Sequence, residues 1–306
     1  MDWDNIRVFL AVARAGHFSA AALALHMDNA TVGRRIIALE KSLGTRLFDR
    51  RPSGSVLTTA GETLIRSAEE MESQLIHAQR DLSQKDVSVS GTVRIAAPDG
   101  FTTYFLCSRL VDLKKRYPSL TLQLVPMSRS VSLSKREADI AITIERPTEG
   151  NVAIRRLVDY SLHFYAAKAY LDQHPRPASD SDLTQHTLVT YVQDLLIADQ
   201  LNFVPKHYGA EYSRFECSSA IGQIAAVRAG AGIGILHDYA AYGEADLDII
   251  LPQLVFERSY WLVTHLDLVG LSRVTAVSEF IAAEVSAHKL MFMPRIVRST
   301  TLESDG

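Results

Sequence analysis

The chain has 306 residues, of which 47% are hydrophobic and 22% charged, and its formal net charge is −3. A chain longer than about 250 residues usually forms more than one domain, and this composition excludes a disordered, collagen-like or disulfide-stapled protein. Charge is unevenly distributed: residues 1–60 carry eight basic and five acidic side chains, whereas residues 61–90 carry three basic and six acidic ones. A basic N-terminal segment on an acidic remainder indicates an attached nucleic-acid-binding module.

The cysteines and the N-terminal segment indicate the cellular compartment of the protein. Cys107 and Cys217 form no Cys-x-x-Cys pair and no Cys/His cluster, so the sequence predicts neither structural zinc nor a disulfide framework. A redox switch would require the fold to bring the two thiols together. The opening MDWDNIR lacks a secretory signal, and no stretch reaches the roughly 20 apolar residues of a membrane span. We therefore expect a cytoplasmic protein with no metal and no membrane partner.

The first 45 residues predict three helices. Gly16 ends the first helix, and Ser19 is expected to cap a short second helix over AAALAL. After a turn at His26 and Met27, Asp28 or Asn29 can cap the third. The first helix has one apolar face, made of Ile6, Phe9, Leu10 and Ala13.

The third predicted helix has a small, flat outer face. Its buried stripe is Val32, Ile36 and Leu39, and Gly44 closes it. The opposite face holds Ala30, Arg34 and Ile37, as a helix entering a major groove requires. Helix, short turn and helix is the helix-turn-helix pattern. An ordinary solvated helix face is the alternative, but the two preceding helices at the right spacing favour DNA.

A β-wing is predicted for RLFDRRPSGSVLTTAGE. Arg50 and Arg51 lie near its tip, where they can contact the DNA backbone or minor groove. Thr59 and Glu62 match a capping box for the next helix. The wing itself consists of an anchor, a turn and a returning edge: Leu47-Phe48, Pro52-Ser53-Gly54 and Val56-Leu57.

The next helix, over about 60–84, carries apolar residues with alternating spacings of four and three. This heptad seam is typical of a coiled coil, which beside a DNA-binding module predicts a dimer element that sets half-site spacing. The alternative is that the seam packs on the protein's own body. Residues 85–91 are a short polar hinge. The seam consists of Leu64, Ala68, Met71, Leu75, Ala78 and Leu82.

From Thr92 onward, strand and helix patterns alternate for about 200 residues. This alternation predicts a mostly parallel sheet with helices on both faces. The tail after Pro294 is polar and expected to be flexible. Predicted strands are VRIAAP, LTLQLVP, DIAITI, 152–166, 187–192, 215–218, AGIGIL and SYWLVTH, and predicted helices are 101–117, about 130–138, 219–229 and 271–288.

Three segments together resemble the LysR-type transcriptional regulators, and the match covers essentially the whole chain. They are FLAVARAGHFSAAALALHMDNATVGRRIIALEKSLGTRLFDRRPSGSVLTTAGE, GTVRIAAP and SSAIGQIAAVRAGAGIGIL. The resemblance implies a winged helix-turn-helix, a linker-helix dimer, and a two-lobed α/β effector domain like the periplasmic binding proteins. It also implies a homotetramer built as a dimer of dimers, a small-molecule co-inducer of unknown identity in the cleft between the lobes, and no other cofactor.

The expected domains follow from the same resemblance. Residues 1–59 form the winged helix-turn-helix domain, 60–90 the linker helix and hinge, 91–293 the effector domain, and 294–306 the tail. The lobes cover about 92–161 plus 267–290, and about 162–266. We expect a DNA-binding regulator and not an enzyme. An enzyme tethered by its helix-turn-helix and an effector-independent architectural DNA protein are the two rivals.

By this resemblance the DNA contacts fall on the third helix and the wing. The family often has Ser-Gln-Pro-Ala where this chain has Asp28-Asn29-Ala30-Thr31, but Asn29 can make the same bidentate amide contact to adenine. Gly33 stands where Ser is frequent; it either allows close approach of DNA or is neutral. The implied contact residues are Asn29, Ala30, Thr31, Gly33, Arg34, Arg35, Arg50, Arg51 and Ser53.

In an open α/β fold, ligands bind where loops leave the carboxyl ends of strands. Ser218 and Ser219 open a helix whose free N–H groups suit an anion, although Ser219 can equally serve only as a cap. Arg129 can pair with a carboxylate ligand or lie in solvent. Asp99 and Glu145 argue against a simple dicarboxylate. The strand-end rule selects Pro98, Asp99, Gly100, Phe101, Thr102, Ser128, Arg129, Glu145, Tyr191, Ser218 and Ser219.

Overall fold

A computed structural model describes residues 2–51, 54–83, 89–127, 138–196, 201–202 and 212–294. The chain divides into two compact units, which are treated separately below. The N-terminal unit contains the described residues up to 83, and the C-terminal unit those from 89 onward. None of the described helices is both long and apolar enough to cross a membrane.

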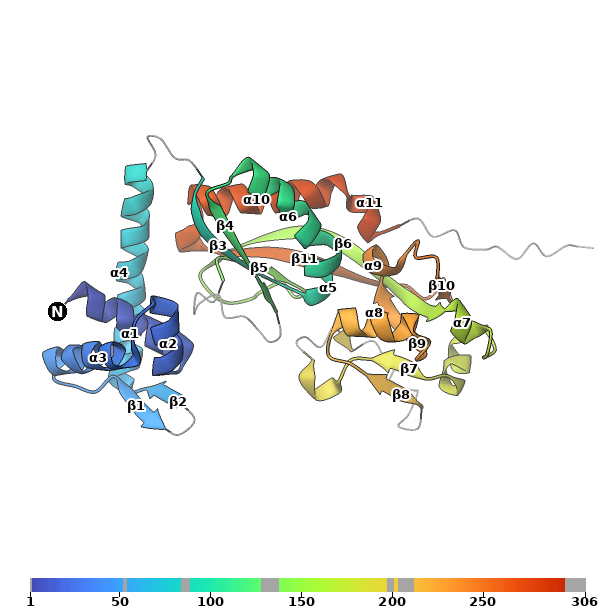
Figure 1. Ribbon diagram of the computed structural model, residues 1–306, viewed down its shortest axis with the longest axis horizontal. Helices are drawn as coiled ribbons and strands as arrows, with labels where there is room; N and C mark the ends of the chain where they lie inside the picture. The colour runs from blue at the N-terminus through green and yellow to red at the C-terminus, as the bar shows by residue number, and fades with distance from the viewer. Residues whose placement is uncertain are drawn as a thin grey trace, which may run out of the picture. The chain divides into compact units, whose positions relative to one another are not determined.

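The N-terminal unit contains the predicted three helices, the two-stranded wing and the long fourth helix (Figure 1). Gly16 and Gly44 terminate α1 and α3 with φ of 68°, a conformation that glycine adopts without strain. The expected cap of α2 is wrong: the helix starts at Phe18, and His17, not Ser19, is the N-cap. The elements are α1 (Trp3–Ala15), α2 (Phe18–Leu25), α3 (Asn29–Leu43), β1 (Phe48–Arg51), β2 (Gly54–Leu57) and α4 (Thr59–Ser83).

One apolar core holds these elements together. The predicted stripes of α1 and α3 are buried in it, except that Ala13 is only partly buried; Leu47 and Phe48 at the start of the wing are buried there too. β1 and β2 pair antiparallel from Phe48 opposite Leu57 to Arg51 opposite Gly54. The expected capping box of Thr59 and Glu62 is wrong: Thr58, one residue earlier, caps α4 by accepting a hydrogen bond from Gly61 N–H at its Oγ1 (3.1 Å), and Gly61 has no side chain to complete a box.

The C-terminal unit is an α/β structure with a nine-stranded sheet. Its strands are β3 (Gly91–Ala97), β4 (Leu120–Pro126), β5 (Ile140–Thr143), β6 (Val152–Ala167), β7 (Leu188–Thr190), β8 (Arg214–Glu216), β9 (Ile233–His237), β10 (Leu247–Ile250) and β11 (Phe256–His265). Its helices are α5 (Asp99–Phe101), α6 (Cys107–Arg116), α7 (Lys168–Leu171), α8 (Ala220–Arg228), α9 (Asp238–Ala241), α10 (Ser272–Ala287) and α11 (Lys289–Phe292). A π-helical turn covers Thr102–Leu106, and 3-10 helices cover Asp180–Gln185, Gln193–Leu195 and Leu266–Leu268.

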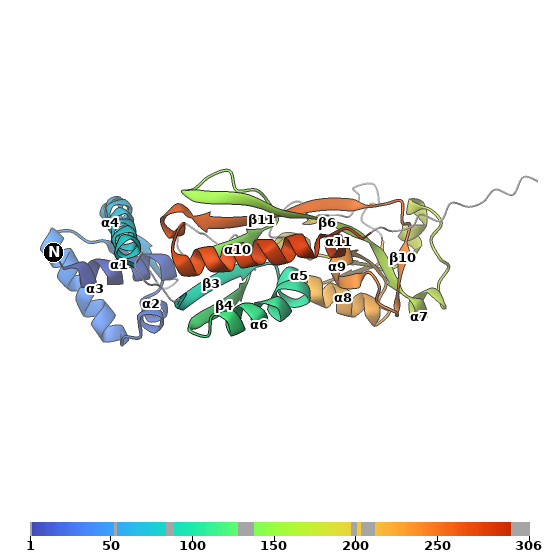
Figure 2. The same ribbon diagram turned by 90° about the horizontal axis from the view of Figure 1, so that it is seen from above.

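The sheet is mixed, so the prediction of a mostly parallel sheet is wrong. Its order is β4-β3-β5-β11-β6-β9-β7-β8, with β10 also paired to β6. β3 pairs in parallel with β4 and β5, and β7 pairs in parallel with β8 and β9. The long strands β6 and β11 run antiparallel to each other and link these two parallel halves (Figure 2). The chain passes from the first half to the second along β6 and returns along β11. These two strands therefore run in opposite directions.

Helices pack on both halves of the sheet. α6 and α10 lie side by side near β3 and β4, and α8 packs against β6, β7 and β9. The helix predicted over 101–117 is three successive segments, because the π-helical turn separates α5 from α6. The helix predicted over about 130–138 falls almost entirely outside the described residues.

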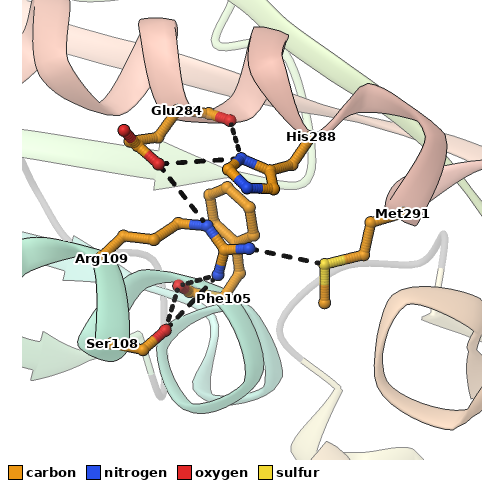
Figure 3. A network of polar contacts seen from close by, with 6 residues as sticks. All are labelled: Phe105, Ser108, Arg109, Glu284, His288 and Met291. Carbon is orange, nitrogen blue, oxygen red and sulfur yellow. Dashed lines mark hydrogen bonds and ion pairs between the residues drawn. The ribbon is translucent and has the colours of Figure 1, made fainter.

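A polar network fastens the C-terminal helices to α6 (Figure 3). Arg109 donates from Nη1 to the Phe105 carbonyl (2.9 Å), its guanidinium covers the Phe105 ring at 3.9 Å, and its Nε lies 3.8 Å from Glu284 Oε2. On α11, the Phe292 ring packs 4.8 Å from Phe105 and 5.2 Å from Tyr239. The network therefore seats α11 against an aromatic cluster that reaches the cleft described next.

Candidate functional site

The N-terminal turn of α3 carries a connected set of polar side chains. Asp28 is the N-cap and accepts a hydrogen bond from Thr31 N–H at Oδ1 (2.7 Å), while Thr31 Oγ1 donates to Oδ2 (2.6 Å). The Thr31 hydroxyl and N–H hold the pKa of Asp28 below its ordinary value. Arg34 Nη2 donates to Thr31 Oγ1 (2.7 Å). The guanidinium is therefore positioned on the exposed face of α3, and Asn29 in the first turn is also exposed.

Gly33 and Arg35 differ in their surroundings. A Cβ added at Gly33 would meet nothing within 4 Å, so the unit's own packing does not require glycine there. Arg35 is half-buried and turned toward α1, with Nη1 3.6 Å from Asp4 Oδ2 and 3.4 Å from Asn5 Oδ1. In this structure Arg35 therefore fastens α3 to α1, whereas Arg34 faces solvent.

The wing is fixed to the helices at two points. Glu40 Oε1 accepts from the backbone N–H of Leu47 (2.7 Å) and Phe48 (3.3 Å), and Ser55 N–H donates to the Gly16 carbonyl (2.7 Å). Arg51 is exposed at the end of β1. The side chain of Arg50 and the whole of Ser53 lie outside the described residues.

The seam of α4 has two environments. Leu64 and Ala68 pack against the unit's own core, as the alternative interpretation expected. Met71 and Leu75 are 41% and 42% exposed. The side chains of Ala78 and Leu82 lie outside the description. Among the described seam residues, the exposed apolar part therefore starts at Met71 rather than at Leu64.

The C-terminal unit contains a cavity of about 380 Å³ between its two parallel halves. Six of the residues selected by the strand-end rule line this cavity: Pro98, Asp99, Gly100, Tyr191, Ser218 and Ser219. Three others do not line it. Phe101 is buried behind the wall against Phe105 and Tyr260, Thr102 belongs to the π-helical turn, and Glu145 is exposed. Ser128 and Arg129 lie outside the described residues.

Sequence reasoning missed other lining residues, among them Met127, Ile144, Leu201, His237, Tyr239 and Tyr260. The strand-end rule itself could have found His237 and Tyr239, since they end β9 and open α9. Tyr260 lies within β11, so only the strand pairing places it in the wall. Its hydroxyl lies 2.9 Å from the Tyr239 hydroxyl, and its ring stacks on Tyr160 at 4.2 Å.

Asp99 joins the two sides of the cavity. Its Oδ2 accepts from Ser219 Oγ (2.6 Å), and its Oδ1 accepts from Gly100 N–H (2.8 Å). Ser219 is also the N-cap of α8, because its Oγ accepts from Gly222 N–H (3.2 Å). The capping role anticipated for Ser219 is therefore confirmed.

Burial sets the protonation of the cavity wall. It lowers the pKa of His237 to about 4, so this imidazole is neutral near pH 7. Burial, and then the negative charge of Asp99, raises the pKa of the Tyr191 hydroxyl. Among the described lining residues, Asp99 is the only Asp, Glu, Lys or Arg.

A second polar cluster lies in the core behind the cavity. The carboxylate of Asp238 accepts from Tyr165 OH (2.8 Å) and from Ser161 Oγ, and lies 2.9 Å from His163 Nδ1. All four residues are buried. Among the described residues no group of three or more His, Cys, Asp or Glu could hold a metal ion. Cys107 and Cys217 are both free thiols.

Comparisons with known proteins agree with this geometry. Residues 3–62 match the family model described as "Bacterial regulatory helix-turn-helix protein, lysR family", and residues 87–286 match the "LysR substrate binding domain". Both matched segments correspond to regions that the structure shows as separate units.

Similar proteins are transcriptional regulators. The chain is 27% identical over 273 residues to the Mau operon transcriptional activator of Paracoccus denitrificans, covering 87% of this chain and 90% of that protein. It is 27% identical over 303 residues to the glycine cleavage system transcriptional activator of Escherichia coli, covering 94% and 95%. The fold is similar to that of full-length AphB from Vibrio cholerae, with a TM-score of 0.60, 23% identity, and coverage of 92% and 99%. These matches show that the chain belongs to the LysR family of DNA-binding transcriptional regulators.

Proposed function

We propose that this regulator recognises its operator through the exposed N-terminal half of α3, with Arg34 and Asn29 reading base edges. The observation that carries the proposal is the fixed geometry of this surface. Thr31 bonds both to the Asp28 cap and to Arg34, so the guanidinium is positioned before DNA arrives. Arginine binds guanine and asparagine binds adenine through paired hydrogen bonds in the major groove. Arg51 and Arg50 of the wing would supply sequence-independent contacts to phosphate.

A homodimer through α4 would present two such surfaces to two half-sites. Support comes from Met71 and Leu75, whose exposed apolar side chains continue the heptad seam beyond the part that the chain's own core covers. The partly buried ion pair between Arg14 Nη2 and Glu72 Oε2 (2.6 Å) fastens α1 to α4. The spacing of two paired α4 helices would then set the spacing of the recognition helices. A tetramer formed by two such dimers, acting on DNA in the cytoplasm, completes the proposal.

The cleft of the C-terminal unit would bind the small-molecule effector. Asp99 and Ser219 come from opposite sides of the cavity and bond to each other, so the state described here has the two sides in contact. A ligand that binds better to one separation of the two sides shifts the population toward it. Coupled through the tetramer, this shift would change the separation of the DNA-binding units and therefore the DNA bend.

Base readout is tested with Arg34→Ala on DNA sites selected from random sequence by the wild-type protein. Arg34→Ala should weaken binding to the selected site by about 1–3 kcal/mol and weaken binding to random DNA much less, measured by fluorescence anisotropy at fixed salt. Lys41→Ala is the matched control, because it removes the same charge from the far end of α3. Equal losses on selected and random DNA for Arg34→Ala would contradict base readout.

A further inference from the structure

Among the described lining residues of the cavity, charge is of one sign only. Of the residues that line it within the described part of the chain, Asp99 carries a negative charge, and none is Lys or Arg. His237 is neutral near pH 7, because burial lowers its pKa to about 4. The remaining polar groups are hydroxyls, from Ser218, Ser219 and the tyrosines.

Asp99 already occupies the position that an anionic ligand would take. The N-terminus of a helix attracts negative charge, and in this cavity the helix is α8. The Asp99 carboxylate lies at its N-cap, 2.6 Å from Ser219 Oγ. A ligand carboxylate at the same place would compete with Asp99 for the Ser219 hydroxyl. It would also face a like charge at short range, which is unfavourable in a partly buried site. The chain's own carboxylate therefore lies where the sequence left an anion subsite open as one alternative to a helix cap.

The rest of the wall suits a cation with an apolar body. Tyr191, Tyr239 and Tyr260 line the cavity together with Met127 and Leu201. Aromatic faces attract ammonium and guanidinium groups, most strongly where water is excluded. The field of Asp99 reaches these groups, since its charge contributes to raising the pKa of both Tyr191 and Tyr239.

We propose that the effector is an organic cation, an amine or guanidine on an apolar or aromatic body. Its charged group pairs with Asp99, and its body lies against the tyrosines. The free face of the carboxylate accepts the ligand's N–H donors while Ser219 continues to donate from the side of α8. The inference rests on the proposed role of the cleft as the effector site and specifies the chemistry that it selects.

The test uses the full-length protein and three probes that share a phenylalkyl body: 2-phenylethylamine, 2-phenylethanol and 3-phenylpropanoate. We expect the amine to raise the melting temperature of the C-terminal unit and to give a measurable Kd by calorimetry. The alcohol should bind at least tenfold more weakly, and the acid should show no binding. Tighter binding of the acid, by pairing with Arg129 or otherwise, overturns the proposal, as does absence of binding by the amine.

Variants assign the effect to Asp99. Asp99→Asn retains an acceptor for Ser219. It should weaken binding of the amine at least tenfold and reduce the ratio of amine affinity to acid affinity. Glu145→Gln is the matched control, because it removes a carboxylate that follows β5 but lies outside the cavity, and it should leave all three affinities unchanged. An amine affinity that Asp99→Asn does not alter would overturn the inference.

A DNA readout separates this inference from the proposed function. If the amine binds through Asp99 but leaves the DNA footprint and bend unchanged, the proposed effector control fails and the ligand class stands. If the acid binds in the cleft and changes the bend, the ligand class fails and the effector control stands.

Discussion

On α3, Arg34 stands in solvent and is positioned by Thr31, one helical turn away, whereas in the cleft Asp99 is positioned by Ser219, 120 residues along the chain. The first arrangement needs only a helix and its cap. The second needs both sides of the C-terminal unit to be assembled. Substitutions on the exposed face of α3 should therefore change DNA binding with little effect on stability, while substitutions around the cleft should affect both ligand binding and folding.

The largest effect is expected at Asp238, in the buried cluster behind the cleft. Asp238→Ala removes the acceptor of Tyr165 and Ser161 and the partner of His163, leaving buried polar groups unsatisfied. We expect it to lower the free energy of unfolding of the C-terminal unit by about 3–5 kcal/mol. Calorimetry of the full-length protein measures this as a shift of that unit's melting transition.

A matched carboxylate on the surface provides the control for this prediction. Asp248 is partly exposed and pairs with Arg176 (2.9 Å), so Asp248→Ala should cost less than about 1 kcal/mol. A loss below that level for Asp238→Ala would show that the cluster is not integral to the fold and would break the contrast between the two units.

The pH dependence of stability is the next effect, and it belongs to the cleft. Burial lowers the pKa of His237 to about 4, although the nearby charges of Asp99 and Asp238 act in the opposite direction. In the unfolded chain the His237 imidazole binds a proton near the ordinary pKa of histidine, about 6.5, whereas in the folded chain it stays neutral down to about pH 4. The free energy of unfolding therefore falls as the pH drops below about 6.5. His17 and His26 of the N-terminal unit are, in contrast to His237, exposed.

Between about pH 7 and pH 5 this single group should remove about 2 kcal/mol from the stability of the C-terminal unit. Urea denaturation of the wild type and of His237→Gln at both pH values isolates the contribution, since other titrating groups are common to the two proteins. Equal pH dependence in the two would contradict a neutral buried His237.

The same contrast between local and long-range contacts explains which features could be predicted from the sequence. The helices of the N-terminal unit follow from local signals, namely an apolar stripe and a terminal glycine in α1 and α3, and these were predicted correctly. The errors there, at Ser19 and Thr59, concern caps displaced by one or two residues. Such displacements arise because neighbouring polar residues compete for the same cap and packing decides between them.

Around the cleft, local signals were insufficient. The rule for strand ends identified Asp99 and Ser219 because each lies within three residues of the end of a strand, β3 or β8. It chose Glu145, whereas its neighbour Ile144 lines the cavity, because adjacent residues of an extended chain point in opposite directions. Tyr260 was missed because its position depends on the antiparallel pairing of β11 with β6, and alternating strands and helices do not reveal that pairing.

The smallest predicted effect tests whether the stability of the N-terminal unit can change without a change in its affinity for DNA. Gly33→Ala places a methyl group where nothing lies within 4 Å, so it should raise the unit's free energy of unfolding by up to about 1 kcal/mol through better helix propensity. Because the added methyl group is small and the space beside Gly33 is open, operator affinity should stay within about twofold. Thermal denaturation and anisotropy measure the two quantities on one protein. A tenfold loss of affinity with the expected gain in stability would mean that DNA approaches the α3 backbone closely at Gly33, and that this glycine is kept for binding at the expense of the helix.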